Sequence, residues 1–468
     1  MTVLAPRSIR VPSRPHGNPP EAPDHCLRRR ALFSLGFPAA ALGAALLVWF
    51  RLPPVAHDTL WAEDGRLFLF GAEQHGLFGA TFVPYAGYLQ FVPRLIAGAV
   101  VRWLPAADWA LGMAAGACLV TGAIACVVFV ASRDVLSSRT LRVILASVVV
   151  LLPLGPRDVL GTPTNLHSLL MWMLFWLLLF TPRTRGGAVT MSLIGLAAAL
   201  SEIQAVFLLP LLVPAARRRH GWLLVSGPVI GIATQLAVTL LAPRSLPTAA
   251  QDSPLSIAEG YLINAIVPDL MPQSQVGRFV ATGGLILAMA IVALLAGLVA
   301  VAWRHALARQ RLAILAAATL SIVVWTASVV DNPAPFYDYA ALSHSQLLHV
   351  WLTRYGVVPG MLLISIALVA TDVLLRRHRH PTDRAPGGHP TRRYRVRYAL
   401  GLAAVACVAV CLTANYLPTW TRRSSGPSWS QQIPAAQDAC SDAPDLRTVT
   451  LNETLGWHVP VLCGYLRE

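Results

Sequence analysis

The stretch RRRALFSLGFPAAALGAALLVWF, residues 28–50, places three arginines directly before twenty residues that carry no charge. An apolar run of about 20 residues is long enough to cross the hydrocarbon core of a bilayer as one helix. Arginines beside a membrane helix mark its cytoplasmic end. The run is longer than the apolar part of a cleavable signal peptide, and further runs follow it. The stretch therefore predicts an uncleaved first membrane helix whose N-terminal side lies in the cytoplasm.

The composition of the whole chain is also typical of a membrane protein. Of its 468 residues 55% are hydrophobic and 13% are charged, whereas soluble domains carry about 25% charged residues. We therefore predict an all-α polytopic membrane protein with about eleven transmembrane helices. The apolar runs lie at residues 31–51, 109–131, 143–156, 167–181, 188–202, 203–216, 222–242, 279–303, 312–330, 356–375 and 398–417.

The placement of arginine predicts the orientation. The chain has no lysine, and 25 of its 37 arginines fall on one side of the membrane if the N-terminus is cytoplasmic. We attribute the net charge of +15 to this topology signal and not to nucleic-acid binding. The predicted layout is a disordered cytoplasmic tail (1–30), a transmembrane domain (31–417) with a long outer loop (52–108), and a small extracytoplasmic tail (418–468). We expect a multi-pass protein of the plasma (inner) membrane.

Two stretches can be interpreted in more than one way. Residues 188–216 are long for one span and short for two, and arginines at both ends favour two short helices that turn near Ser201 and Glu202. Counting residues 87–104 as a span would reverse every later connection and place the arginine-rich loops outside. We therefore expect an interfacial amphipathic helix or a shallow re-entrant helix at 87–104.

The first outer loop contains a dense group of ionisable residues. It reads HDTLWAEDGRLFLFGAEQHG from His57, so that Asp58, Glu63 and Asp64 lie just past the first span. Adjacent carboxylates point in different directions, so one of Glu63 and Asp64 can act as a general base while the other makes a structural bond. Such carboxylates can also hold a divalent cation such as Mg²⁺ or Mn²⁺. Alternatively, they simply begin a helix, where acidic residues favour the helix dipole.

Further candidate residues lie in the other predicted outer segments. Arginine at the membrane surface is suited to phosphate, which favours Arg94 and Arg354. His167 can move a proton, and Glu202 is an acid within an apolar stretch. Plainer roles stay open, such as contact of Arg94 with lipid headgroups or capping of a helix by Asn165. The full set of candidate substrate-binding residues is His57, Asp58, Tyr88, Arg94, Asn165, His167, Glu202, Arg354 and Tyr355.

The C-terminal tail contains two of the seven cysteines, Cys440 and Cys463. If the tail lies outside the cytoplasm, its oxidising surroundings allow a disulfide between them, and we expect that bridge. The alternative is two free thiols in an irregular tail. No cysteine and histidine spacing typical of a metal site occurs in the sequence, so we predict no metal site of that type.

From the segment WAEDG at residues 61–65, the chain resembles the GT-C superfamily of membrane glycosyltransferases. Those enzymes have many spans and a long first outer loop with interfacial helices, in which a short acidic motif supplies the catalytic carboxylate. The segments GYLQFVPRL at 87–95, NLH at 165–167 and Arg354-Tyr355 look like an actinobacterial branch of the superfamily. The resemblance covers the layout of most of the chain, but its motif is only two acids long.

The resemblance implies the transfer of a hexose or pentose from a polyprenyl-phosphate carrier to an envelope glycan, lipid or protein. Asp64 or Glu63 would deprotonate or orient the acceptor hydroxyl, and the order Glu then Asp leaves open which of them is catalytic. The two arginines named above would neutralise the departing phosphate. Asn165 and His167 would line the sugar pocket.

Two other classes of protein remain open. A flippase or transporter for lipid-linked sugars requires intramembrane charges on a central path and broken helices in two related halves. Only Glu202 lies well inside an apolar run, and the sequence shows no internal repeat. A non-catalytic membrane scaffold would tolerate any replacement of Glu63 and Asp64.

Overall fold

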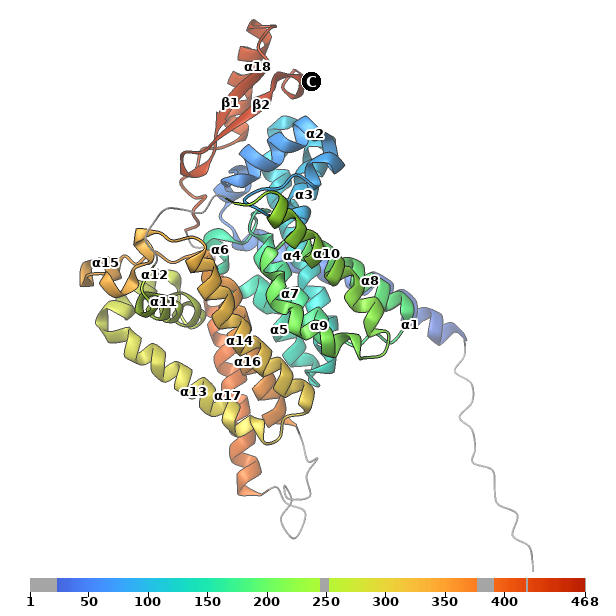
Figure 1. The fold of residues 1–468 in the computed structure, drawn as a ribbon, viewed down its shortest axis with the longest axis vertical. Helices are drawn as coiled ribbons and strands as arrows, with labels where there is room; N and C mark the ends of the chain where they lie inside the picture. The colour runs from blue at the N-terminus through green and yellow to red at the C-terminus, as the bar shows by residue number, and fades with distance from the viewer. Residues whose placement is uncertain (1–22, 245–251, 377–390, 418–419, 468) are drawn as a thin grey trace, which may run out of the picture. The chain divides into compact units, whose positions relative to one another are not determined.

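The computed structural model describes residues 23–244, 252–376, 391–417 and 420–467 (Figure 1). The chain divides into two compact units, Met1–Ala39 and Ala40–Glu468, and every contact discussed below lies within the second. The α-helices are α1 (Pro23–Arg51), α2 (Phe70–Thr81), α3 (Phe91–Trp103), α4 (Trp109–Ala131), α5 (Arg139–Leu151), α6 (Gly155–Asp158), α7 (Leu166–Leu179), α8 (Arg185–Ala199), α9 (Leu209–Ala216), α10 (Gly221–Leu241), α11 (Pro254–Tyr261), α12 (Gln273–Phe279), α13 (Leu285–Trp303), α14 (Ala308–Val330), α15 (His344–Leu348), α16 (Val357–Leu375), α17 (Arg392–Ala414) and α18 (Ile433–Asp442).

The apolar helices are those of a multi-pass membrane protein. Seven helices in the described part of the chain are long and apolar enough to cross a membrane: Ala106–Asp134, Arg139–Asp158, Gly221–Leu241, Gln273–Trp303, Ala308–Val330, Arg354–Leu375 and Arg392–Ala414. Four shorter apolar helices are Gly36–Arg51, Leu166–Leu179, Arg185–Ala199 and Ile203–Ala216. Each of the eleven predicted apolar runs overlaps one of these helices. The cytoplasmic tail predicted for residues 1–30 lies largely outside the described residues.

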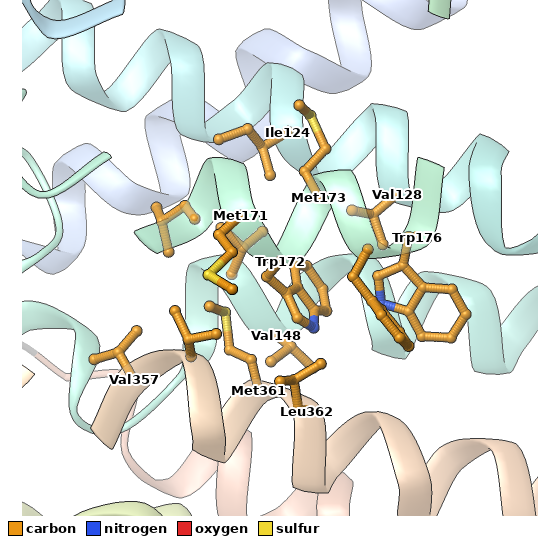
Figure 2. Close-up of a cluster of buried hydrophobic side chains, with 14 of the residues drawn as sticks. Ile124, Val128, Val148, Met171, Trp172, Met173, Trp176, Val357, Met361 and Leu362 are labelled. Atoms are coloured by element: carbon orange, nitrogen blue, oxygen red, sulfur yellow. The ribbon is translucent and has the colours of Figure 1, made fainter. Parts of the chain in front are cut away.

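The core forms around α7, which is apolar on all sides. Every residue of α7 except His167 is buried, as expected of a helix that other helices surround. Trp172 and Trp176 pack among side chains of α4, α5 and α16 (Figure 2). The Trp172 indole donates a hydrogen bond to Ser365 Oγ at 3.2 Å, so its only polar atom is satisfied. In contrast, only 11% of the span that contains α13 is buried, which leaves an apolar surface suited to lipid.

The two ambiguous stretches fold as non-spanning and broken helices. The chain turns at Leu200 and Ser201, between α8 and the short helix Ile203–Leu208 that leads into α9. The first N–H groups of α3 bind this turn, because Phe91 N donates to Leu200 O at 3.3 Å and Val92 N donates to Ser201 Oγ at 3.0 Å. With 13 residues α3 is about 20 Å long, which is too short to cross the hydrocarbon core.

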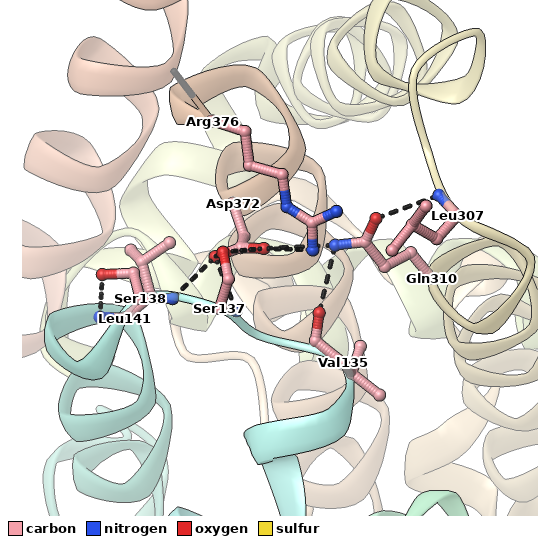
Figure 3. A network of polar contacts seen from close by, with 8 residues as sticks. All are labelled: Val135, Ser137, Ser138, Leu141, Leu307, Gln310, Asp372 and Arg376. Carbon is pink, nitrogen blue, oxygen red and sulfur yellow. Dashed lines mark hydrogen bonds and ion pairs between the residues drawn. The ribbon is translucent and has the colours of Figure 1, made fainter. Parts of the chain in front are cut away.

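The buried carboxylate of Asp372 joins the loop before α5, helix α14 and helix α16. Asp372, near the end of α16, accepts hydrogen bonds from the backbone N–H of Ser137 and of Ser138, each at 3.0 Å (Figure 3). It also accepts from Gln310 Nε2 in α14 and pairs with Arg376, both at 3.1 Å. These bonds satisfy a charge that would otherwise be costly to bury.

The C-terminal tail is a small folded element that packs on the first loop. Strands β1 (Thr448–Asn452) and β2 (His458–Leu462) form an antiparallel hairpin in which Leu451 faces Val459. A disulfide joins Cys440 in α18 to Cys463, the pair for which the sequence predicts a bridge. The apolar side of the hairpin, with Val459 and Val461, shares one core with Phe68 of the first loop.

Candidate functional site

The acidic motif at residues 61–65 lies on a sharp turn that begins a helix. Ala62 has a φ of 43°, which is uncommon for a residue with a side chain. Asp64 N donates to Trp61 O at 2.8 Å, and a π-helical segment, Asp64–Leu69, then continues directly into α2. This turn sends the side chains of Glu63 and Asp64 to different surroundings.

Asp64 is buried and bonded to the second loop. Its side chain is 2% exposed, and its Oδ1 accepts hydrogen bonds from Thr164 N at 2.8 Å and Thr164 Oγ1 at 2.6 Å. Burial raises the pKa of Asp64 to about 7, although the bonds from Thr164 and the charge of Arg423 act in the opposite direction. Asp64 is not among the residues that line the cavity described next. Its role is to tie the first loop to the segment before α7.

Glu63, in contrast, lines a cavity of about 160 Å³. Its Oε1 accepts a long hydrogen bond from the Tyr85 hydroxyl at 3.4 Å, and its Oε2 is buried and has no hydrogen-bond partner among the residues that the structure describes. An unbonded carboxylate oxygen at a cavity wall is free to accept a proton or a hydrogen bond from a ligand. The cavity lining comprises Glu63, Tyr85, Ala86, Tyr88, His167, Ser168, Glu202, Ile203, Gln204, Arg244, Val324, Ser328, Asp331, Asn332, Arg354, Tyr355 and Val358.

A histidine and a carboxylate form a pair in the cavity wall. His167 Nδ1 bonds Glu202 Oε2, and Glu202 Oε1 accepts the N–H of Gln204 at 2.9 Å. Both oxygens of Glu202 are therefore occupied, and the histidine ring is held through one nitrogen. No described residue bonds Nε2 of His167, so this nitrogen remains available to a ligand in the cavity.

Two arginines face the same cavity. Arg354 lies beside its neighbour Tyr355, with the guanidinium carbon 5.8 Å from the ring centre, and makes no hydrogen bond or ion pair to any residue that the structure describes. Arg244 donates from Nη2 to Asn332 Oδ1 at 2.8 Å, a neutral partner. A guanidinium presents five N–H donors in a planar fork that suits phosphate oxygens. The cavity therefore combines an unbonded carboxylate oxygen with cationic donors that no carboxylate occupies.

The structure places five of the nine predicted substrate-binding residues in this cavity: Tyr88, His167, Glu202, Arg354 and Tyr355. Glu63 is a sixth predicted residue there, from the pair proposed to be catalytic. The hydroxyl of Tyr88 accepts a hydrogen bond from Gln90 Nε2 at 3.0 Å, which fixes the phenol ring at the wall.

Arg94, which the sequence predicts as a phosphate ligand, does not line this cavity. Its side chain is 2% exposed, lies over the Phe68 ring at 5.0 Å and donates to Leu67 O at 3.4 Å. Burial lowers the pKa of Arg94 to about 10, so the group stays charged at neutral pH. Arg94 therefore fastens α3 to the helix that follows the acidic motif.

His57, Asp58 and Asn165, also predicted to bind substrate, do not line the cavity and have partners elsewhere in the chain. The His57 ring stacks on Trp49 with centroids 3.8 Å apart. Asp58 accepts hydrogen bonds from Ser430 N at 3.0 Å and Ser430 Oγ at 2.8 Å, in the tail. Asn165 donates to the backbone of the preceding turn, and its side chain does not cap α7.

Sequence reasoning missed Arg244, Asn332, Gln204 and Ser328, which complete the cavity wall. Gln204 Nε2 donates to Ser328 Oγ at 2.9 Å and so joins the turn after α8 to α14. A signal for Arg244 existed, because it is one of the few arginines in the segments predicted to lie outside. The neutral side chains carry no comparable signal.

Neither a cluster of metal ligands nor a known relative identifies the chemistry of the site. Within the described residues, no group of three or more His, Cys, Asp or Glu side chains is arranged to hold a metal ion. Searches of protein-family models, curated proteins and solved structures find no match for this chain. The charged residues that line the cavity are therefore the basis for a proposed function.

Proposed function

We propose that this protein is a membrane glycosyltransferase of the GT-C type. It transfers a hexose or pentose from a polyprenyl-phosphate carrier to a hydroxyl of an envelope glycan, lipid or protein, on the extracytoplasmic side of the plasma membrane. The observation that carries the proposal is the presence of Glu63 and Arg354 in one cavity: no described residue is hydrogen-bonded to Glu63 Oε2, and none forms a hydrogen bond or ion pair with Arg354. Such a pair matches a reaction in which a hydroxyl loses a proton and a phosphate departs.

The proposed reaction assigns a separate task to each charged group. Glu63 Oε2 accepts the proton of the acceptor hydroxyl as its oxygen attacks the anomeric carbon. The bond between that carbon and the phosphate oxygen breaks, and the phosphate leaves with the electron pair and inversion at the carbon. Arg354 and Arg244 neutralise the charge that develops on the phosphate. His167, whose Nδ1 donates to Glu202, accepts a hydrogen bond from a sugar hydroxyl at Nε2.

The assignment of the base to Glu63 instead of Asp64 follows from their surroundings. The Asp64 carboxyl group accepts two hydrogen bonds from Thr164 at Oδ1 and does not line the cavity. Glu63 lines the cavity, and its Oε2 is hydrogen-bonded to no described residue. Asp64 supports the reaction by keeping the turn at residues 61–65 in place.

Purified variants in proteoliposomes test the proposal directly. Wild-type protein is supplied with radiolabelled polyprenyl-phosphate hexoses and pentoses and with an envelope extract as acceptor, and the released polyprenyl phosphate is measured. Glu63→Gln is expected to lower kcat by about 100-fold or more, because the amide cannot accept the proton. Arg354→Gln is expected to lower kcat similarly, by about 100-fold. Arg102→Gln, on an exposed part of α3, is the matched control.

Transfer by Glu63→Gln at the wild-type rate would contradict the assignment of Glu63 as the base, whereas no release of polyprenyl phosphate by the wild-type protein with any donor would contradict the proposed function and favour a scaffold. A transporter for lipid-linked sugars is the second candidate, because Glu202 lies at the break between two short apolar helices and faces the cavity. The same proteoliposomes distinguish the two. A transporter moves the labelled carrier between leaflets with its sugar still attached, whereas a transferase releases polyprenyl phosphate.

A further inference from the structure

Glu453, in the C-terminal tail, lies against the first turn of the helix that starts at Asp64. Its Oε2 accepts the backbone N–H of Arg66 at 3.2 Å, and Gly65 lies beside the same carboxyl group. The Glu453 side chain is 3% exposed, although the two partners are 387 residues apart in the chain. A carboxyl group from the end of the chain therefore meets the acidic motif near its beginning.

Gly65 makes this approach possible. A Cβ atom at Gly65 would lie 2.4 Å from Glu453 Oε2 and 2.4 Å from Val459 Cγ2, well inside contact distance. Only glycine, which has no side chain, leaves room for the carboxyl group and the hairpin. The glycine of the WAEDG segment thus serves the docking of the tail.

The contact supplies a cap that the local sequence lacks. The first N–H groups of a helix have no partner inside the helix, and a side chain at the N-cap position usually satisfies one of them. Here Glu63 occupies the N-cap position and makes no such bond. Because Glu453 accepts the N–H of Arg66 instead, the side chain of Glu63 is not needed as a cap and faces the cavity.

We propose that Glu453 is a positioning residue for the transfer reaction: it caps the helix at Asp64 from the tail and thereby keeps Glu63 directed into the cavity. This inference rests on the proposed function. Neighbouring contacts support it, because Thr454 Oγ1 donates to Leu60 O at 2.6 Å and Trp429 N donates to Asp58 O at 2.8 Å. The tail therefore holds the loop at residues 58 and 60, just before the motif, as well as at Arg66 after it.

The protonation state of Glu453 fits a cap placed close to two other acids. Burial raises the pKa of Glu453 to about 9, and the charges of Asp64 and Glu63 act in the same direction. The carboxyl group is therefore neutral at pH 7 and adds no repulsion beside them. Glutamine, which is neutral and has a carbonyl oxygen at the same distance from the backbone, is a close mimic of this state.

Hydrogen–deuterium exchange of the full-length protein in detergent tests the cap without reference to activity. Glu453→Ala is expected to raise the exchange rates of amides in residues 64–70 by about fivefold to tenfold, the effect of losing one helix cap. Glu453→Gln is expected to keep the wild-type rates. The control is Glu73→Ala, because Glu73 accepts Leu462 N of the tail at 2.7 Å without contacting the motif, and exchange at 64–70 should then stay unchanged.

Kinetics with the labelled donors then separate positioning from loss of folded protein. Glu453→Ala is expected to lower kcat by about tenfold or more with KM nearly unchanged, because a small displacement of a reacting group is costly. Glu453→Gln is expected to restore kcat. If the alanine variant does not fold, Glu453→Asp, which is one methylene shorter, should show the same two effects.

Two outcomes would overturn the inference. The first is unchanged exchange at residues 64–70 in Glu453→Ala, and the second is a kcat of Glu453→Gln as low as that of Glu453→Ala. Failure of the proposed function has a different signature. In that case the wild-type protein itself releases no polyprenyl phosphate, while the exchange data still decide whether Glu453 caps the helix.

Discussion

Replacing Asp64 by asparagine is expected to remove a loss of stability that the wild-type protein shows as the pH rises. The asparagine Oδ1 can accept the same two hydrogen bonds from Thr164 N and Oγ1 that the carboxyl group accepts. The amide carries no charge at any pH. The variant therefore keeps the geometry of the turn and removes only the ionisation of the buried group.

The sign and size of the effect follow from the raised pKa. Below pH 4 the carboxyl group is protonated in both the folded and the unfolded chain and contributes no pH dependence. Between the ordinary pKa of 3.8 and the folded pKa of about 7, the unfolded chain releases the proton while the folded protein keeps it, so stability falls as pH rises. At 1.36 kcal/mol per pKa unit the loss reaches about 4 kcal/mol, and it is constant above pH 7.

Thermal unfolding in detergent, followed by tryptophan fluorescence between pH 4.5 and pH 8, measures this difference. The buried carboxyl groups of Glu73 and Glu453 add their own pH dependence, so the informative quantity is the difference in Tm between wild type and Asp64→Asn at each pH. We expect the variant to gain stability relative to wild type from pH 4.5 to pH 7 and to hold that gain above pH 7. Parallel curves for the two proteins across the whole range would refute a buried, proton-bearing Asp64.

Two further changes test the docking of the tail. Gly65→Ala should destabilise the protein by about 1–3 kcal/mol, because its Cβ would overlap Glu453, whereas Gly297→Ala, with nothing within 4 Å, should not; thermal unfolding compares them. Reduction of the Cys440–Cys463 disulfide, which closes a sequence separation of 23 residues, should cost about 3 kcal/mol, and limited proteolysis should then cleave the tail sooner; equal cleavage rates with and without reductant would contradict this.

The membrane helices could be predicted from the sequence because hydropathy is a local property. Each apolar run overlaps a helix, and the turn near Ser201 lies where arginines at both ends of the stretch suggested it. The cavity could be predicted only in part. Its charged members, such as Glu63 and Arg354, are conspicuous in an apolar chain, but their meeting depends on segments far apart in sequence.

The predicted site residues that lie away from the cavity do so for a shared physical reason. Arg94 and Asp58 are charged residues near a predicted membrane surface, and the sequence alone does not show that other parts of the chain satisfy them. Arg94 is covered by Phe68 and Asp58 by the tail residue Ser430. Conversely, Arg244 carried a signal, as one of the few arginines in the segments predicted to lie outside, but its place in the cavity depends on packing between segments far apart in sequence.

The docking of the tail also constrains how the protein is made. The first loop leaves the ribosome hundreds of residues before Glu453 is translated. The helix that starts at Asp64 therefore first forms without the carboxyl group that accepts the N–H of Arg66. A nascent chain that stops before residue 420 contains every apolar helix and still lacks this partner. Docking of residues 420–467 onto the first loop therefore follows the synthesis of the apolar helices, and a chain that stops before residue 420 would lack the contacts of Glu453 and Thr454 with that loop.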